Sequence, residues 1–405
     1  MLDIFENITL ENDNIPALAS LRQKGKAAFK GLPTLKDEPY KYTNLQSALT
    51  PQMFSQKPHA CGHEHCTCHE ACLDFETHEF HFCDGRLHEH FHFIEGLEIS
   101  SLKEALSTHE AAAYIGKFDL ASFPLAALNT ALLEEGLFIR ISKPLDKPLA
   151  LIYHNKEGNL ANIRNLIVLE KGAKAEIIEV FEGADSPYLT NIVTEISIAK
   201  KASLLHHKLQ NEGQSAIHIA FSNVLVKSEG EYHSYLLSKG AKLSRCETRV
   251  LLKEENADAV VNAAYCINNA QTADVTTNIA HLAPLSTSNQ IIRGVMDDSA
   301  HGVFQGKIHI APDAQKTEGH QQHKALLLSS NARVDVKPEL EIFADDVKCS
   351  HGATSGDLNA EELFYLKSRG IGENEARKIL TSAFLNTAFE EIENKNIKAF
   401  LTDSF

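Results

Sequence analysis

The spacing of hydrophobic and polar positions divides the chain into three regions. In residues 1–136, apolar residues recur with helical spacing, as in the stretch IPALASLRQKGKAAFKGL (15–32). In residues 137–350, short β-rich runs such as NLIVLE and AEIIEVF replace this pattern. From residue 351 onward the helical spacing returns. We therefore expect a mainly β core flanked by an N-terminal and a C-terminal helical region.

Two local signals refine the N-terminal region. Asp84-Gly85, between the alternating runs FHFC and RLHEHFHF, predicts a hairpin with a two-residue turn of type I′. A later helix is expected to begin with Ser122 as its N-cap and Pro124 in its first turn, and to end at Gly136.

Small or turn-forming residues punctuate the middle region between its β-rich runs. A β-meander or a sandwich can produce such spacing, but a small residue at every turn favours a solenoid, because each corner must stack on the next. We therefore prefer a parallel β-helix, with the sandwich as the alternative. The punctuating residues are Ala173, Ala202, Gly230, Ala241, Ala257, Ala270, Pro284, Ala300, Ala314 and Ala332.

The C-terminal region carries two helix signals. Asn359 as N-cap with Glu362 at the third helical position forms a capping box, and Gly370 marks the end of that helix. The next helix has an apolar stripe that includes Ile379 and Phe384. These helices are too few to build a core of their own, so we expect them to dock on the end of the solenoid or on another protein.

Composition and charge exclude several classes of partner and location. The 405 residues carry a net charge of −15, with 39 Lys and Arg against 54 Asp and Glu, which argues against nucleic acid or an anionic membrane as a partner. No apolar run reaches the length of about 18 residues expected of a membrane span, and the acidic N-terminus is unlike a signal peptide. We expect a cytoplasmic protein whose eight cysteines are reduced.

Five of these cysteines lie close together, four of them in HACGHEHCTCHEAC (59–72). This insertion, about residues 55–78, has almost no apolar content, so a bound metal would have to supply its order. Zinc or iron is the candidate metal, and the alternative is a mobile segment that binds metals adventitiously. The candidate ligands are Cys61, His65, Cys66, Cys68, His69 and Cys72.

A sparser pair, Cys349 and His351, lies where the β pattern gives way to helix. On a strand, residues two apart point to the same side, so a thiolate and an imidazole there can share a soft metal, transfer sulfur or activate one another. The alternative is a buried cysteine beside a strand-end histidine. No nucleotide-binding loop accompanies the pair: GVFQGKIH has one residue too few between its glycines for a Walker A motif.

The stretch ELEIFADDVKCSHGATSGDLNAEELFYLKSRGI (339–371) strongly resembles the signature of the SufB/SufD family of Fe–S cluster assembly scaffolds. GKIHIAPDAQKTEGHQQHKALLLSSNARVDVKPELEI, ALNTALLEEGLFIRI and GLPTLKDEPYKYTNL resemble other parts of that family, so the likeness spans nearly the whole chain. Chain length, the helical N-terminal region and the single Cys349 in the late core favour the SufD branch. Tyr40 replaces a usual tryptophan, and the Cys/His insertion has no counterpart in the family pattern.

The resemblance implies a right-handed parallel β-helix without enzymatic activity or a tightly bound cofactor. It implies partners as well: a SufB protein that pairs through the β-helices, and the ABC-type ATPase SufC, which docks on the C-terminal helices (about 358–393). His351 and the adjacent thiol of Cys349 then match the positions implicated in building a transient Fe–S cluster at the SufB–SufD interface. A homodimer is the alternative for the isolated chain. The expected contacts with SufC are Phe364, Tyr365, Arg369, Ile379 and Phe384.

Two other functions stay open at this point. A β-helix enzyme acting on polysaccharide would need an acidic groove and usually a secretion signal, and neither is evident. A metal-storage or metal-delivery protein would centre on the Cys/His insertion. Metal analysis with and without residues 55–78 separates the second function from a scaffold that co-purifies with an ATPase.

Overall fold

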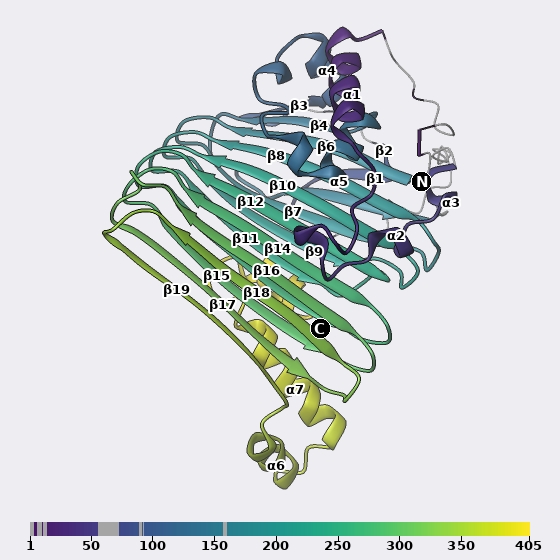
Figure 1. The fold of residues 1–405 in the computed structure, drawn as a ribbon, viewed down its shortest axis with the longest axis vertical. Coiled ribbons are helices and arrows are strands. Elements are labelled where there is room, and N and C mark those ends of the chain that lie inside the picture. Colours follow the sequence, from purple (N-terminus) through teal and green to yellow (C-terminus); the bar gives the residue numbers. More distant parts are fainter. Residues whose placement is uncertain are drawn as a thin grey trace.

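The computed structural model describes residues 4–5, 10, 14–55, 73–88, 91, 93–156 and 160–405. Its core is a parallel β-helix, in which successive strands alternate between two sheets (Figure 1). Sheet A has the order β19-β17-β15-β13-β11-β9-β7-β5-β1-β2, and sheet B has the order β18-β16-β14-β12-β10-β8-β6-β4-β3. The prediction of a mainly β protein with a parallel β-helix between helical regions is confirmed, and the sandwich alternative is wrong.

Most strands of the β-helix have about the same length, and each stacks in register on the equivalent strand of the next coil. Those of sheet A are β5 (Leu149–Asn155), β7 (Lys174–Gly183), β9 (Ser203–Asn211), β11 (Glu231–Ser238), β13 (Asp258–Ile267), β15 (Thr287–Met296), β17 (Thr317–Leu327) and β19 (Val347–Gly356). Those of sheet B are β4 (Leu137–Ile141), β6 (Leu160–Leu169), β8 (Leu189–Ile198), β10 (Ile217–Val226), β12 (Leu243–Leu252), β14 (Thr272–His281), β16 (His301–Ile310) and β18 (Arg333–Ile342). The boundary expected at residue 350 lies inside β19, which runs six residues further.

Small residues fill many corners of the coils, as the punctuation pattern suggested. Ala173, Ala202 and Ala300 are fully buried. A residue with positive φ stands one position before Ala173 and Ala202 and two positions before Ala300, and it turns the chain into the next strand. Ala270 departs from the pattern: it is exposed, and the buried side chain at that corner belongs to Gln271.

The N-terminal end of the β-helix is closed by antiparallel pairing. β1 (His78–Cys83) pairs with β5 and folds back on β2 (Arg86–Leu87), while β3 (Leu97–Ser101) pairs antiparallel with β4. The turn between β1 and β2 is Asp84-Gly85, and both residues have positive φ, as a type I′ turn requires. The predicted hairpin is confirmed.

Helices of the N-terminal region cover the outer face of sheet B (Figure 1). The fifth helix begins after Phe123 and ends at Ala131, so the prediction of Ser122 as N-cap and Gly136 as helix end is wrong. Ser122 ends a preceding 3-10 turn instead, where its hydroxyl donates to Asp119. The elements are α1 (Pro16–Ala28), η1 (Glu38–Tyr40), α2 (Leu45–Ala48), α3 (Gln52–Ser55), α4 (Leu102–Ser107), η3 (Ala111–Ala113), η4 (Leu120–Ser122) and α5 (Pro124–Ala131).

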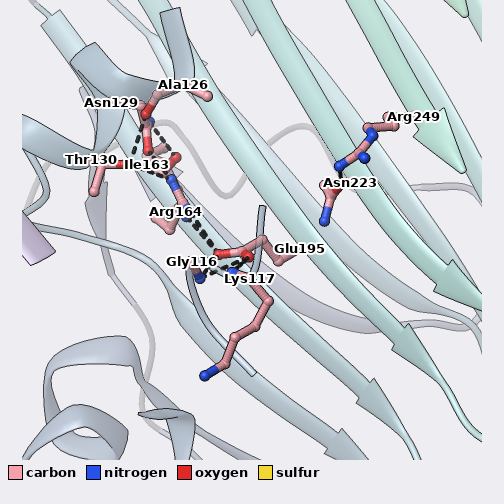
Figure 2. Close-up of polar contacts among 10 residues, drawn as sticks. All are labelled: Gly116, Lys117, Ala126, Asn129, Thr130, Ile163, Arg164, Glu195, Asn223 and Arg249. Carbon is pink, nitrogen blue, oxygen red and sulfur yellow. Dashed lines mark hydrogen bonds and ion pairs between the residues drawn. The ribbon is translucent and has the colours of Figure 1, made fainter. Parts of the chain in front are cut away.

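A buried ion pair fixes this helical layer to sheet B (Figure 2). The Arg164 guanidinium on β6 donates to Glu195 on β8 at 2.6 and 3.1 Å, and to the Thr130 hydroxyl of α5 at 2.8 Å. The backbone N–H of Gly116 donates to both carboxylate oxygens of Glu195 at 2.8 Å. The two buried charges thus have partners on α5, on the loop at Gly116 and on both strands. These contacts hold the N-terminal helical layer in one position on sheet B.

The C-terminal helices are α6 (Ala360–Ser368), α7 (Glu373–Asn386) and α8 (Lys395–Thr402). Leu385, Phe389 and Ile397 are buried against outward-facing residues of sheet A such as Ile178 and Val260. The second half of this region therefore docks on a face of the β-helix, and the prediction that it docks on the solenoid end or on another protein is wrong for it. In contrast, α6 has no buried residue and projects beyond the last coil (Figure 1).

No helix in the described ranges is both long and apolar enough to cross a membrane.

Candidate functional site

Cys349 and His351 lie on β19, the last strand of sheet A. They point toward the inside of the β-helix, in register with Gly319 and Gln321 of β17. β19 and β18 are the outermost strands of their sheets, so both residues stand at the open end of the solenoid. The expectation that the two side chains share one side of a strand agrees with this register.

Cys349 is half-buried. Its side chain packs against a small apolar cluster that includes Ile308, Ala314 and Leu340. Burial raises the pKa of the Cys349 thiol, and a backbone hydrogen bond at Gly319 acts in the opposite direction. The thiol must lose its proton to bind a metal, so an incoming cation would supply the compensating charge.

His351 is exposed at the mouth of the last coil. The outward face of the same strand is different, because its polar side chains are paired with β17. The imidazole of His320 lies 2.8 Å from the Ser350 hydroxyl, and Lys348 forms an ion pair with Glu318 at 2.6 Å. In the part of the chain that is described, no side-chain hydrogen bond to His351 occurs, so its ring is available to a ligand.

Polar side chains lie directly beneath this pair, inside the β-helix, and the sequence analysis missed them. Gln321 is 3% exposed, and His323 is 1% exposed. The His323 ring stacks on Phe304 and lies 2.7 Å from the Tyr265 hydroxyl, and burial lowers the pKa of His323 to about 4. The period of two along a strand could have revealed them in TEGHQQHKALL (317–327). It places Gly319, Gln321 and His323 on one face, and two of these three side chains are polar.

One thiol and one imidazole suit iron, but they cannot by themselves complete a tetrahedral site. Across the described ranges, no group of three or more His, Cys, Asp or Glu side chains is placed to hold a metal ion. A metal at Cys349 and His351 would therefore need ligands from sulfide, solvent or a second protein.

Residues 56–72, the main part of the Cys/His insertion, fall outside the described residues. This applies to every predicted ligand there, namely Cys61, His65, Cys66, Cys68, His69 and Cys72. A zinc or iron site in the insertion stays a prediction.

Of the residues predicted to bind a partner, four are exposed and one is not. Phe364 and Tyr365 of α6 are 73% and 56% exposed, and the Arg369 guanidinium lies over the Tyr365 ring. Ile379 of α7 is also exposed. Phe384 instead packs against the cluster on sheet A, beneath the Arg293 guanidinium, so it holds α7 to its own chain.

Asn359 caps α6 as predicted: its side-chain oxygen accepts from the backbone N–H groups of Glu361 and Glu362. Gly370 follows the helix with positive φ, in agreement with the predicted helix end. The cap begins α6 only a few residues after β19 ends at Gly356, so the exposed helix is joined closely to the strand that carries Cys349 and His351.

Comparison with known proteins identifies both halves of the chain. The profile described as "SUF system FeS cluster assembly, SufBD core domain" matches residues 152–384, and that of the "SufBD protein N-terminal region" matches residues 3–151. The Fe–S cluster assembly protein SufD of Escherichia coli is 29% identical over 91% of this chain and 87% of its own length.

Two other relatives are covered less completely. A Fe–S cluster assembly SufBD family protein of Synechocystis is 32% identical over 70% of this chain and 66% of its own length. The chloroplastic protein ABCI7 of Arabidopsis thaliana is 32% identical over 72% of this chain and 64% of its own length. The alignments thus span just under two thirds of each of these two relatives.

Proposed function

This chain belongs to the SufBD family of Fe–S cluster assembly proteins, and we propose that it is a scaffold subunit on which nascent clusters are built together with a SufB-type protein and the ATPase SufC. In this proposal iron and sulfide are the cargo. The chain contributes ligands and geometry, and the ATPase contributes the energy.

The position of Cys349 and His351 carries the proposal. Both lie on the final strand, at the end where the β-helix has no further strand among the described residues. The free edges of β18 and β19 suit the addition of strands from a second β-helix. A SufB-type partner docked there would bring its own side chains to the pair and complete the coordination of iron.

The exposed helix α6 suits the ATPase. Its apolar side chains Phe364 and Tyr365 face solvent, although large exposed aromatic groups usually mark an interaction site. Because α6 begins at Ala360 and β19 ends at Gly356, a pull on α6 during the ATP cycle would be passed directly to β19. Movement of β19 would open or close the pairing edge at Cys349 and His351.

The proposal is tested by replacing His351 with alanine in cells that rely on this pathway alone for Fe–S enzymes. We expect maturation of those enzymes to be lost, because iron at the open end loses a ligand. His320→Ala is the matched control: this exposed imidazole is on the neighbouring strand but faces outward. Normal maturation in the His351→Ala cells would refute the role proposed for the pair.

A further inference from the structure

The end of α7 is tied to sheet A through the side chain of Arg293 on β15. The Arg293 Nε–H donates to the hydroxyl oxygen of Thr387, the C-cap of α7, at 2.8 Å. Its Nη2 donates to the Gln322 amide oxygen of β17 at 2.7 Å, and its Nη1 donates to the Ile292 carbonyl oxygen of its own strand at 3.0 Å. A single guanidinium therefore joins α7, β15 and β17.

Arg293 is costly to bury. The residue is 6% exposed, and the three groups that accept from its guanidinium are all uncharged. Burial lowers the pKa of Arg293 although Glu390 acts in the opposite direction, so its desolvation is not fully compensated. An apolar side chain would pack beside Ile291 and Phe384 without this cost. The guanidinium, in contrast, directs its hydrogen bonds from a rigid fork, and so it sets the position of α7 relative to β17.

The C-terminal arm (residues 360–386, helices α6 and α7) is attached to the β-helix at two places. Its first end follows β19 after the short linker 357–359. Its second end is the last turn of α7, where Phe384 and Leu385 pack on sheet A and Thr387 accepts from Arg293. Between these places α6 has no buried residue and projects beyond the last coil (Figure 1). A force on the C-terminal arm must therefore be taken up at one of the two attachments.

The two strands beside these attachments are held differently. Arg293 holds β17 from the outer face through Gln322, which is in register with Gly352 of β19, the residue after His351. On β19 the outer face is open at this level. Apart from the adjoining residues, no described atom lies within 4 Å of the place that a Cβ of Gly352 or Gly356 would take. The second half of β19 is thus free to move beside a strand that is tied to α7.

We propose that Arg293 is a positioning residue that fixes the end of α7 against β17, so that the C-terminal arm turns about this end and its displacement appears at β19. The inference rests on the proposed function, in which the ATPase supplies the force on the arm. With the end of α7 fixed, β19 follows α6. Without this tie α7 would follow α6 instead, and Cys349 and His351 would stay in place.

Hydrogen exchange of the isolated full-length chain tests the tie itself. Thr387→Val removes the hydroxyl but keeps the shape of the side chain, and the amides of the last turn of α7 (383–386) should exchange about 10-fold faster. Gln322→Met changes β17, yet it should speed up the same amides, because the guanidinium transmits the loss to α7. The double variant should add little to either single variant, since both act through one side chain.

Thr381→Val is the matched control for this experiment. The Thr381 hydroxyl donates to the carbonyl oxygens of Arg377 and Lys378 within α7, so its loss should not speed up the last turn of the helix. An unchanged last turn in folded Gln322→Met would overturn the inference, because α7 would then be held without help from the guanidinium.

The complex with the SufB-type protein and the ATPase tests the consequence. In the wild type, a non-hydrolysable ATP analogue should speed up amide exchange in β19. Arg293→Met should bind the ATPase as the wild type does, but the response to the analogue should shift from β19 to the last turn of α7. A role in packing alone would not move this response. Thr387→Val cuts the same tie by a milder change and replaces Arg293→Met if that variant does not fold.

The outcomes separate the inference from the proposed function. A response of wild-type size at β19 in the folded variants would overturn the inference, and the ATPase and His351 would keep their proposed roles. A wild-type chain that does not bind the ATPase would instead overturn the proposed function. The exchange of α7 in the isolated chain does not depend on the ATPase, so it would still decide whether Arg293 ties α7 to β17.

Discussion

The two ends of the β-helix are built differently. At the N-terminal end, β2 pairs antiparallel with β1, β3 pairs antiparallel with β4, and helix α4 packs against β3. The interior there holds aliphatic and aromatic side chains such as Phe82, Ile139 and Leu151. At the C-terminal end, β18 and β19 are the outermost strands, and the interior holds polar side chains such as Gln321 and His323.

We call the first the stabilising end, and the second, where the proposed function places the cluster site, the working end. A solenoid needs a cap wherever its edge would otherwise meet water, since free strand edges recruit other chains. The capped end satisfies that need within the chain. In the proposed function a partner covers the open end, and the same end carries the thiol, the imidazole and the polar interior beneath them.

The largest effect should come from removing an aromatic side chain from the capped end. Phe82 is fully buried and stacks on Tyr153, so Phe82→Ala should lower the free energy of unfolding by about 3–5 kcal/mol. The matched change Phe343→Ala, at an exposed position beside β18, should cost less than about 1 kcal/mol. Urea unfolding measures both, and equal losses would contradict a stabilising role confined to the capped end.

The buried ion pair near the capped end should contribute more to stability than the exposed ion pair near the open end. Glu195→Gln leaves the buried Arg164 guanidinium without its counter-charge and should cost about 3 kcal/mol. Lys348→Met breaks the exposed pair with Glu318 near the open end, and because solvent screens this pair, stability should stay nearly unchanged. Thermal unfolding of the two variants checks this, and a larger loss in Lys348→Met would reverse the comparison.

The polar interior of the open end should make stability depend on pH. Burial holds the pKa of His323 at about 4, below the value of about 6.5 in an unfolded chain, so unfolding in acid takes up a proton. This histidine therefore contributes fully above about pH 6.5, and the protein should lose about 2 kcal/mol through it between pH 7 and pH 5. In His323→Gln, the free energy of unfolding measured with urea should lose that much less between pH 7 and pH 5. An unchanged pH dependence of this free energy would show that His323 is charged when buried.

The smallest effect concerns the exposed helix α6. If α6 binds the SufC-type ATPase as proposed, Phe364→Ser should weaken that binding about 10-fold, because a large apolar contact is lost. Stability should change by less than about 0.5 kcal/mol, since α6 has no buried residue. Calorimetric titration gives the affinity. Phe384→Ser is the contrast, because Phe384 packs on its own chain and its loss should mainly reduce stability.

Local signals in the sequence predicted much of this fold. The Asp84-Gly85 turn, the Asn359 cap and the small residues at the corners each depend on the conformation of a few neighbouring residues, so they can be recognised without knowing the fold. Ser122 shows the limit of such signals. Its hydroxyl pairs with Asp119 in a 3-10 turn, and α5 starts after Phe123 without a side-chain cap.

What could not be predicted depends on long-range packing. The stripe with Ile379 and Phe384 predicts an apolar face on the second C-terminal helix, but only the assembled coils show that sheet A covers Phe384 while Ile379 stays exposed. The same holds for the site. Cys349 and His351 are recognisable within one short stretch, whereas Gln321 becomes relevant only through the register between β17 and β19.

Hydrogen exchange of the chain, alone and with the SufB-type protein of the same cells, tests the central claim most directly. If the open end is the working end, backbone amides of β18 and β19 should exchange rapidly in the isolated chain and become strongly protected in the complex. Amides of β1, β2 and β3 should be equally protected in both states. Protection that appears at β1–β3 while β18 and β19 stay unchanged would contradict the account.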